Sequence, residues 1–227
     1  MNIGFFHVDT HSDASSDAYI YARAMLRSAK QCMPRVPVVM LTDLTSKAVK
    51  GVDDVRRKPL EPLALHRMRH HASVSGDWLF VDTDVIFQQP VTKVFKDNPD
   101  FDIAVTTREW SHLKVASGFS ARMPFNTGVV FSRRPSFWQE AYCRLKWLSP
   151  ELQQWMGDQE VIGDIVTDES CGYRVKQLKG SKFNYPPATE TVKPQNLEAD
   201  AAIVHYKGPT RKPLLRQRIR QESRRCA

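Results

Sequence analysis

The amino-acid sequence predicts an α/β fold in which helices cover the faces of a β-sheet. Through the first half of the chain, short apolar runs bounded by turn residues alternate with longer amphipathic stretches, which is the pattern of strands and helices that follow one another. The chain has 227 residues, of which 41% are hydrophobic and 26% are charged, so it suits one domain or one domain with a tail. A chain of this length buries most of its apolar surface without crosslinks.

The first elements are a strand, a helix and a second strand. Residues 3–8 form a short apolar run, which is typical of a buried strand. Ser15-Ser16-Asp17 supplies N-cap side chains for a helix that we expect to run to about Gln31. Residues 38–41 are again apolar and predict the next strand, after which a polar connector extends to Pro59.

The next helix and strand lead to two aspartates. Pro62 suits the first turn of a helix that extends to about residue 74. Residues 78–81 predict a third buried strand, which stops at Asp82-Thr83-Asp84. Residues 108–125 have the composition of a long irregular loop. Further strands are expected at residues 103–106, 129–131, 173–178 and 201–205, and further helices from residue 136, at residues 157–166 and in the basic tail.

Asp82 and Asp84 need a physical explanation, because two like charges at the end of a buried strand repel each other. A divalent cation placed between the carboxylates and a phosphate removes this repulsion, and Mg²⁺ and Mn²⁺ prefer such oxygen ligands. Ligands of open α/β sheets bind beyond the carboxyl ends of the strands, which is where this pair lies. The sequence therefore predicts a metal site here; the alternative is that the two aspartates only cap the next turn.

A second chemistry uses the same pattern. Haloacid-dehalogenase-like phosphatases also place D-x-D after a strand, with a nucleophilic aspartate, and Gly163-Asp164 with Asp168 resembles their downstream acidic motif. Their D-x-D normally follows the first strand, with a small or hydroxyl residue nearby. Here about eighty residues precede the pair and Val85 follows it. A phosphatase remains an alternative at this point.

Four segments, in this order along the chain, resemble the motifs of glycosyltransferase family 8, the galactosyl-, glucosyl- and glycogenin-type enzymes. They are residues 80–85 (the D-x-D strand), residues 125–130 (F-N-[SA]-G-V), Asp158-Gln159 (D-Q) and residues 205–213 (H-x-x-G-x-x-K-P). The resemblance implies a GT-A fold, a Rossmann-like mixed sheet with helices on both faces. Its donor half would comprise about residues 1–107 and its acceptor half about residues 108–213, followed by a basic tail of residues 214–227.

The resemblance also implies a metal site with three protein ligands. Asp82, Asp84 and His205 would bind Mn²⁺ or Mg²⁺, and a neutral imidazole suits Mn²⁺. Without the motif around it, a histidine at a strand end is more often a satisfied core residue.

Further roles follow from the same motifs. A UDP-hexose is the expected sugar donor, and its sugar and diphosphate would contact Asp82, Thr83, Arg67, Gly208 and Lys212. One extra residue separates Gly208 from Lys212, so Arg211 is a second candidate for the lysine's role. Val8 and Asp9 are expected near the base, although the chain lacks the family's usual D-x-N-Y start.

Asn126, Asp158 and Gln159 are the expected catalytic residues. By the resemblance, Asn126 would contact hydroxyl groups, and Asp158 and Gln159 would face the anomeric carbon. The family retains the anomeric configuration, so we expect retention; the alternative is that Asp158 acts as a general base in an inverting reaction.

The histidines beside Arg67 are a separate feature. His66, His70 and His71 lie on the same expected helix, together with Arg69. We expect them to form a solvated face, and a histidine metal cluster is the alternative.

The acceptor is less constrained by the sequence. The loop contains Trp110, Lys114 and Arg122, which we expect to contact it. One candidate acceptor is a saccharide of a surface glycan or lipopolysaccharide, with the basic tail on an anionic membrane. The other is a hydroxymethylated pyrimidine in DNA, which the net charge of +8 and the arginine-rich tail favour.

A non-catalytic nucleic-acid-binding protein with the same fold is the alternative from a different class. The sequence has no apolar stretch of membrane-spanning length and no CxxC pair, so we expect a cytoplasmic protein of a bacterium or of a virus-infected cell.

Overall fold

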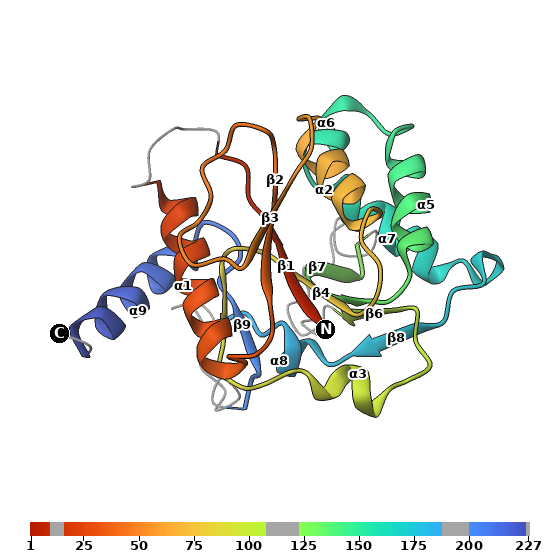
Figure 1. Ribbon diagram of the computed structural model, residues 1–227. Coiled ribbons are helices and arrows are strands. Elements are labelled where there is room, and N and C mark those ends of the chain that lie inside the picture. Colours follow the sequence, from red (N-terminus) through yellow and green to blue (C-terminus); the bar gives the residue numbers. More distant parts are fainter. Residues whose placement is uncertain (10–15, 108–122, 188–199, 226–227) are drawn as a thin grey trace.

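The computed structural model describes residues 1–9, 16–107, 123–187 and 200–225. A seven-stranded sheet with the order β3-β2-β1-β4-β7-β6-β8 forms its centre (Figure 1). The strands are β1 (Asn2–Phe6), β2 (Val38–Thr42), β3 (Asp54–Arg57), β4 (Trp78–Val81), β6 (Ile103–Thr107), β7 (Phe125–Ser132) and β8 (Val175–Leu178). The sheet confirms the α/β fold class expected from the sequence.

The direction of the strands changes beside β4. Strands β3, β2, β1 and β4 are parallel to one another, whereas β7 runs antiparallel to both β4 and β6. Strand β8 is again parallel to β6. The strand order also reverses beside β1, because β2 lies on one side of it and β4 on the other. The carboxyl end of β4 therefore borders the switch point at which open α/β sheets bind ligands.

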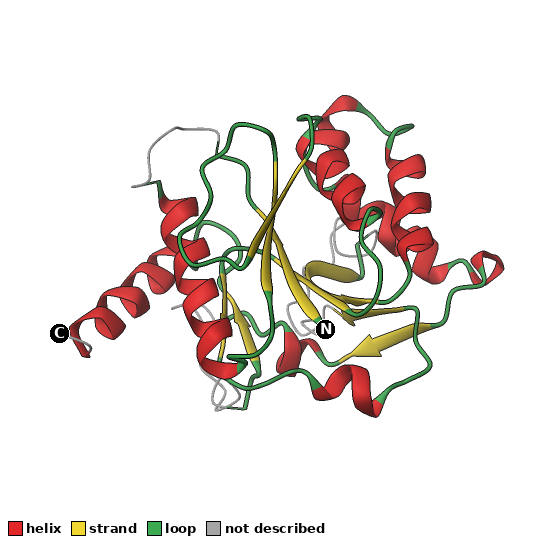
Figure 2. Cartoon of the chain, viewed as in Figure 1, coloured by secondary structure: helices red, strands yellow, loops and turns green. Residues whose placement is uncertain are grey.

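Helices cover both faces of the sheet (Figure 2). Helix α1 (Asp17–Cys32), capped by Ser16, and helix α3 (Lys93–Asp97) pack on one face with Ile3 and Phe5 of β1. Val39 and Leu41 of β2 point to the other face, because successive side chains of a strand alternate. Helices α2 (Leu63–His71), α5 (Pro135–Leu145) and α7 (Gly157–Thr167) pack on that face.

Beyond β4, the chain contributes a strand to a small second sheet. Strand β5 (Val85–Phe87) pairs antiparallel with β9 (Ile203–His205). The remaining short elements are α6 (Pro150–Gln154), a 3₁₀ helix (Glu169–Cys171) and α8 (Gly180–Phe183). Within the described residues, no helix combines the length and the apolar character needed to cross a bilayer.

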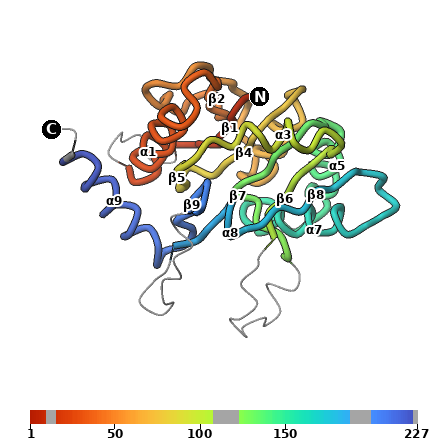
Figure 3. The backbone as a smooth tube through the Cα atoms, turned by 90° about the horizontal axis from the view of Figure 1, so that it is seen from below, coloured from red at the N-terminus to blue at the C-terminus, as the bar shows by residue number. Residues whose placement is uncertain are grey.

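The basic tail is a helix that packs on the body of the protein. Helix α9 (Lys212–Arg225) lies beside α1, as Figures 1 and 3 both show. Its Leu215 is fully buried with Tyr21 of α1, Ile86 of β5 and Val204 of β9. The boundary that we expected between the acceptor half and the basic tail, after residue 213, therefore falls inside a helix. The apolar side chains of this helix belong to the core.

Strands β3 and β5 were missed by the sequence-based assignment, and β7 begins earlier than expected. The expected polar connector contains the edge strand β3, whose residues are mostly exposed and so form no apolar run. Strand β7 begins at Phe125 and not at residue 129, because Asn126 and Thr127 are polar residues inside a strand. These positions are polar because they face the site described below.

The expectation that the α2 histidines form a solvated face is wrong. His66 and His70 are fully buried, and His71 stacks on Phe80 with the ring centroids 3.7 Å apart. The Nε2 atom of His70 donates a hydrogen bond to the carbonyl of Thr42 at 2.9 Å. A neutral imidazole is a flat ring with one donor, so these histidines pack against the sheet as aromatic residues do.

The buried histidines predict a pH-dependent stability. Burial, reinforced by the neighbouring His66, lowers the pKa of His70 to about 4, and burial also lowers the pKa of His66 and His71. In the unfolded chain these groups titrate near pH 6.5, so below that pH the unfolded state binds more protons and the free energy of unfolding falls until about pH 4.

We expect His70→Gln, whose amide can still donate to Thr42, to lose part of this dependence. Urea unfolding at pH 7 and pH 4.5 should show a difference in free energy smaller by about 2 kcal/mol than in the wild type. An unchanged difference between the two pH values would contradict the assignment.

Candidate active site

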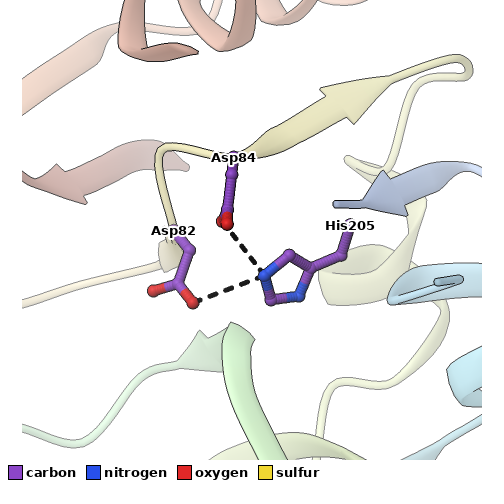
Figure 4. Close-up of side chains that lie close together, drawn as sticks. All are labelled: Asp82, Asp84 and His205. Carbon is purple, nitrogen blue, oxygen red and sulfur yellow. Dashed lines mark hydrogen bonds and ion pairs between the residues drawn. The ribbon is translucent and has the colours of Figure 1, made fainter. Parts of the chain in front are cut away.

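The carboxyl end of β4 brings two aspartates next to a distant histidine. Asp82 follows β4, and its backbone N–H donates to the carbonyl of Gly128 on β7 at 2.9 Å. Asp84 precedes β5, and His205 ends β9. Because Val85 pairs with His205 across these two strands, His205 lies beside Asp84 although 121 residues separate them (Figure 4).

The three side chains converge on a single point. The Nε2 atom of His205 lies 3.1 Å from Oδ1 of Asp84 and 3.5 Å from Oδ2 of Asp82. One ligand atom from each residue lies within 4.8 Å of the other two. The side chain of Asp82 is 34% exposed, whereas those of Asp84 and His205 are 10% and 2% exposed. The cluster is therefore open only on the side of Asp82.

The other nitrogen of His205 determines what the cluster can bind. The Nδ1 atom lies 2.7 Å from Oδ1 of Asn184, and the amide nitrogen of Asn184 donates to Asn126 and Thr106 at 2.7 Å each. Since the amide oxygen only accepts, Nδ1 carries the hydrogen and Nε2 of a neutral imidazole carries a lone pair. This lone pair points at two carboxylates that also only accept hydrogen bonds. A cation at this point satisfies all three groups, and the donor set suits a divalent metal.

Gly128 keeps this imidazole in place because it has no side chain. A Cβ atom at this position would lie 2.2 Å from Cε1 and 2.6 Å from Nδ1 of His205. The glycine of the F-N-x-G segment thus leaves the space that the metal-site histidine occupies.

Asp84 is ionised despite its burial. Burial by itself would raise the pKa of this carboxyl group, but His205, when its imidazole also carries a proton on Nε2, and the ammonium group of Lys212 hold its pKa well below the ordinary value. The Nζ atom of Lys212 lies 3.3 Å from Oδ2 of Asp84. Helix α9 therefore begins with a cation at the site.

Arg67 connects Asp82 to a third carboxylate. Its Nη1 atom donates to Oδ1 of Asp82 at 3.0 Å, and its Nη2 atom forms an ion pair with Oδ2 of Asp158. The hydroxyl of Thr127 donates to the same oxygen of Asp158 at 3.0 Å. Helices α2 and α7 thus place one guanidinium between two acidic residues.

These groups line a pocket of about 220 Å³. Of the residues expected from the sequence, its lining includes Arg67, Asp82, Thr83, Asp84, Asn126, Asp158, Gln159 and Lys212. His205 is not part of the lining but completes the cluster with Asp82 and Asp84. The lining also includes residues that sequence reasoning missed: Phe6, Leu63, Ala64, Thr127, Gln154, Trp155 and Met156.

Some of the missed pocket residues lie in a sequence motif that could have identified them, and others do not. Thr127 lies inside the F-N-x-G segment and could have been chosen for its position. Asn184 orients His205 from the chain after α8, and no local pattern marks it. Trp155 precedes the D-Q pair, but its exposure becomes visible only in the structure.

The other expected residues lie outside this lining. Gly208 has a positive φ of 77°, which glycine adopts readily, and the Nε atom of Arg211 donates to the carbonyl of Pro187 at 2.9 Å. Lys212, rather than Arg211, thus contacts the carboxylate cluster. Val8 is half-buried, and the backbone N–H of Asp9 donates to the hydroxyl of Ser46 at 2.6 Å. Trp110, Lys114 and Arg122 lie outside the described residues.

The acidic residues that resemble a phosphatase motif are elsewhere. Asp164 is exposed on α7, and Asp168 accepts hydrogen bonds from Ser170 beside the 3₁₀ helix. Neither belongs to the lining of the pocket. This placement does not support the phosphatase alternative.

Comparisons with known proteins identify the fold. No family model and no curated protein sequence matches the chain. The galactosyltransferase LgtC, solved in complex with donor and acceptor sugar analogues, is 14% identical, with 92% of this chain and 88% of that chain covered and a TM-score of 0.58. A glycosyltransferase involved in the glycosylation of the major capsid of PBCV-1 is 15% identical, with coverages of 95% and 100% and a TM-score of 0.57.

A third similar structure is larger. The glycosyltransferase GlyE of Streptococcus pneumoniae TIGR4 is 14% identical, with 91% of this chain but 55% of that chain covered and a TM-score of 0.61. The mixed sheet, its helices on both faces and these likenesses together show that the chain has the GT-A fold of glycosyltransferases.

Proposed function

We propose that this protein is a metal-dependent glycosyltransferase that moves a hexose from a nucleoside-diphosphate sugar, with UDP-hexose the first choice, to a hydroxyl group of an acceptor. The observation that carries the proposal is the convergence of Asp82, Asp84 and His205 at a pocket that also contains Lys212 and Arg67. A GT-A fold alone does not determine an activity, so the proposal rests on this site.

The carboxylates and His205 would hold Mn²⁺ or Mg²⁺. When bound, the cation would supply positive charge that stabilises the departing diphosphate. Lys212 lies on the pocket wall and contacts Asp84 at 3.3 Å, so its ammonium group is positioned for the same developing negative charge. Thr83 lies between the two aspartates and is assigned to the sugar donor.

Asp158, Gln159 and Asn126 are assigned to the reacting sugar. All three line the pocket, and Asp158 is held by Arg67 and Thr127. An ion pair with a guanidinium favours the carboxylate and weakens it as a proton acceptor, which supports retention over an inverting reaction with Asp158 as the base. Val8, Asp9, Gly208 and Arg211 remain proposed contacts of the nucleotide.

A saccharide of a surface glycan is one candidate acceptor, in keeping with the acceptor sugar analogue bound by LgtC. A hydroxymethylated pyrimidine in DNA is the second, and the exposed side of α9 favours it. Arg216, Arg220 and Arg224 recur every fourth residue, about 6 Å apart along the helix axis. The apolar side chains of α9 pack on the body, which leaves a polar, cationic surface with no apolar face for a bilayer.

The donor half of the proposal predicts the effect of removing one ligand. Asp84→Asn should lower Mn²⁺-dependent release of UDP from UDP-glucose or UDP-galactose by at least about a hundredfold, because the amide no longer supplies a charged ligand. Its thermal unfolding temperature without metal should fall, because Lys212 and His205 lose the carboxylate with which they interact, so circular dichroism at the assay temperature must show that the variant is folded.

Asp164→Asn is the matched control, because Asp164 is an exposed aspartate on α7 outside the pocket. Release of UDP by the Asp84 variant at the rate of this control would show that the metal is held elsewhere. A wild-type protein that turns over no sugar nucleotide would favour the non-catalytic alternative.

The acceptor half predicts a salt-dependent interaction with DNA if the second candidate is correct. The double variant Arg220→Gln, Arg224→Gln should bind hydroxymethylcytosine DNA more weakly, with a slope of log affinity against log salt smaller by about 1 to 2. The control is Lys93→Gln, Lys96→Gln on α3, which removes two exposed charges elsewhere. Equal DNA binding by the two double variants would leave the saccharide as the acceptor.

A further inference from the structure

Trp155 is an exposed aromatic residue at the wall of the pocket. It is 70% exposed and lines the pocket together with Asp82, Asp158 and Lys212. Trp147 is 90% exposed but does not line the pocket. Exposing an indole to water costs free energy. A tryptophan that is fixed in an exposed position beside charged groups therefore indicates a surface that binds a ligand.

A strained turn holds Trp155 in this position. Helix α6 ends before it, and the backbone N–H of Trp155 donates to the carbonyl of Glu151 at 2.9 Å. Met156 follows with a φ of 71°, a left-handed conformation that is uncommon for residues with a side chain. Such conformations persist where the surroundings enforce them, and they concentrate at functional sites.

Gly157 shows what enforces the turn. A Cβ atom at this position would lie 2.5 Å from the carbonyl oxygen of Leu152 and 2.7 Å from Cδ1 of Leu145. Helix α7 therefore begins in close contact with the backbone of α6, and the chain must reverse at Met156. Because Asp158 lies one residue beyond this contact, the turn fixes Trp155 relative to the proposed reacting groups.

The wall that carries Trp155 differs from the metal side of the pocket. It consists of Leu63, Ala64 and Met156 together with the indole, and Oε1 of Gln154 accepts from the backbone N–H of Leu63 at 3.2 Å. The charged diphosphate suits the part of the lining that contains Lys212 and the carboxylates. The apolar wall is thus left for an uncharged ring.

We propose that Trp155 is the acceptor platform of this enzyme and stacks on the C–H face of a pyranose ring. This inference rests on the proposed function, since it places the acceptor opposite the sugar donor. The negatively polarised face of an indole attracts the C–H hydrogens of a sugar. A flipped nucleobase needs a snug slot that repays its unstacking, whereas an indole that is 70% exposed offers an open surface.

The test compares Trp155→Ala and Trp155→Phe with Trp147→Ala. The assay contains Mn²⁺, UDP-glucose or UDP-galactose, and methyl β-D-glucopyranoside or methyl β-D-galactopyranoside as the acceptor. Transfer to the pyranoside and hydrolysis of the sugar nucleotide are measured together by mass. We expect the ratio of transfer to hydrolysis to fall about tenfold in Trp155→Ala, to recover in Trp155→Phe and to stay unchanged in Trp147→Ala.

A binding measurement separates this inference from the proposed function. Titration with the same pyranosides should change the tryptophan fluorescence of the wild type and of Trp147→Phe, but not of Trp155→Phe. An unchanged ratio in Trp155→Ala, or a fluorescence response that persists in Trp155→Phe, would overturn the platform. A Trp155-dependent response to 5-hydroxymethylcytidine and to neither pyranoside would overturn the assignment to a sugar. If the wild type turns over neither sugar nucleotide while the Trp155-dependent response to a pyranoside is present, the proposed function fails and the platform stands.

Discussion

The site depends on an electrostatic conflict among Asp82, Asp84 and His205. Asn184 fixes the hydrogen of the imidazole on Nδ1, so the Nε2 lone pair faces two carboxylates at 3.1 and 3.5 Å. Three acceptors that converge without a donor repel one another, and a cation turns the same geometry into a ligand set. The nearby cations Lys212 and Arg67 offset part of this charge from the two sides. The pocket is thus prepared for a metal with an anionic substrate.

The topology of the sheet brings these groups together. The reversal between β4 and β7 places the aspartates opposite the Asn126–Gly128 stretch, and the pairing of β5 with β9 brings in His205. Helix α9 then begins with Lys212 at the pocket and continues along α1, so one helix connects the proposed diphosphate site to an arginine-rich surface. The apolar wall with Trp155 comes from α2 and from the turn between α6 and α7. Metal, nucleotide and acceptor would each meet a different part of the fold.

Many of the strands and site residues could be predicted from the sequence because local patterns indicate them. Apolar runs marked β1, β2 and β4, and the motifs around Asp82, Asp158 and His205 marked the site residues that line or complete the pocket. Strand β3 was missed because it is an exposed edge strand. The α2 histidines were placed in solvent because residue type alone does not show that an imidazole packs as an aromatic ring. Asn184 and Trp155 act through tertiary contacts, which no local pattern encodes.

The central claim is that His205 is a metal ligand together with the two aspartates. Pulsed electron paramagnetic resonance of the protein with Mn²⁺ and UDP tests it directly, because a nitrogen bound to Mn²⁺ produces a ¹⁴N coupling. We expect one histidine coupling in the wild type and its loss in His205→Gln. A wild-type spectrum without nitrogen coupling, or a coupling that persists in His205→Gln, would contradict the account.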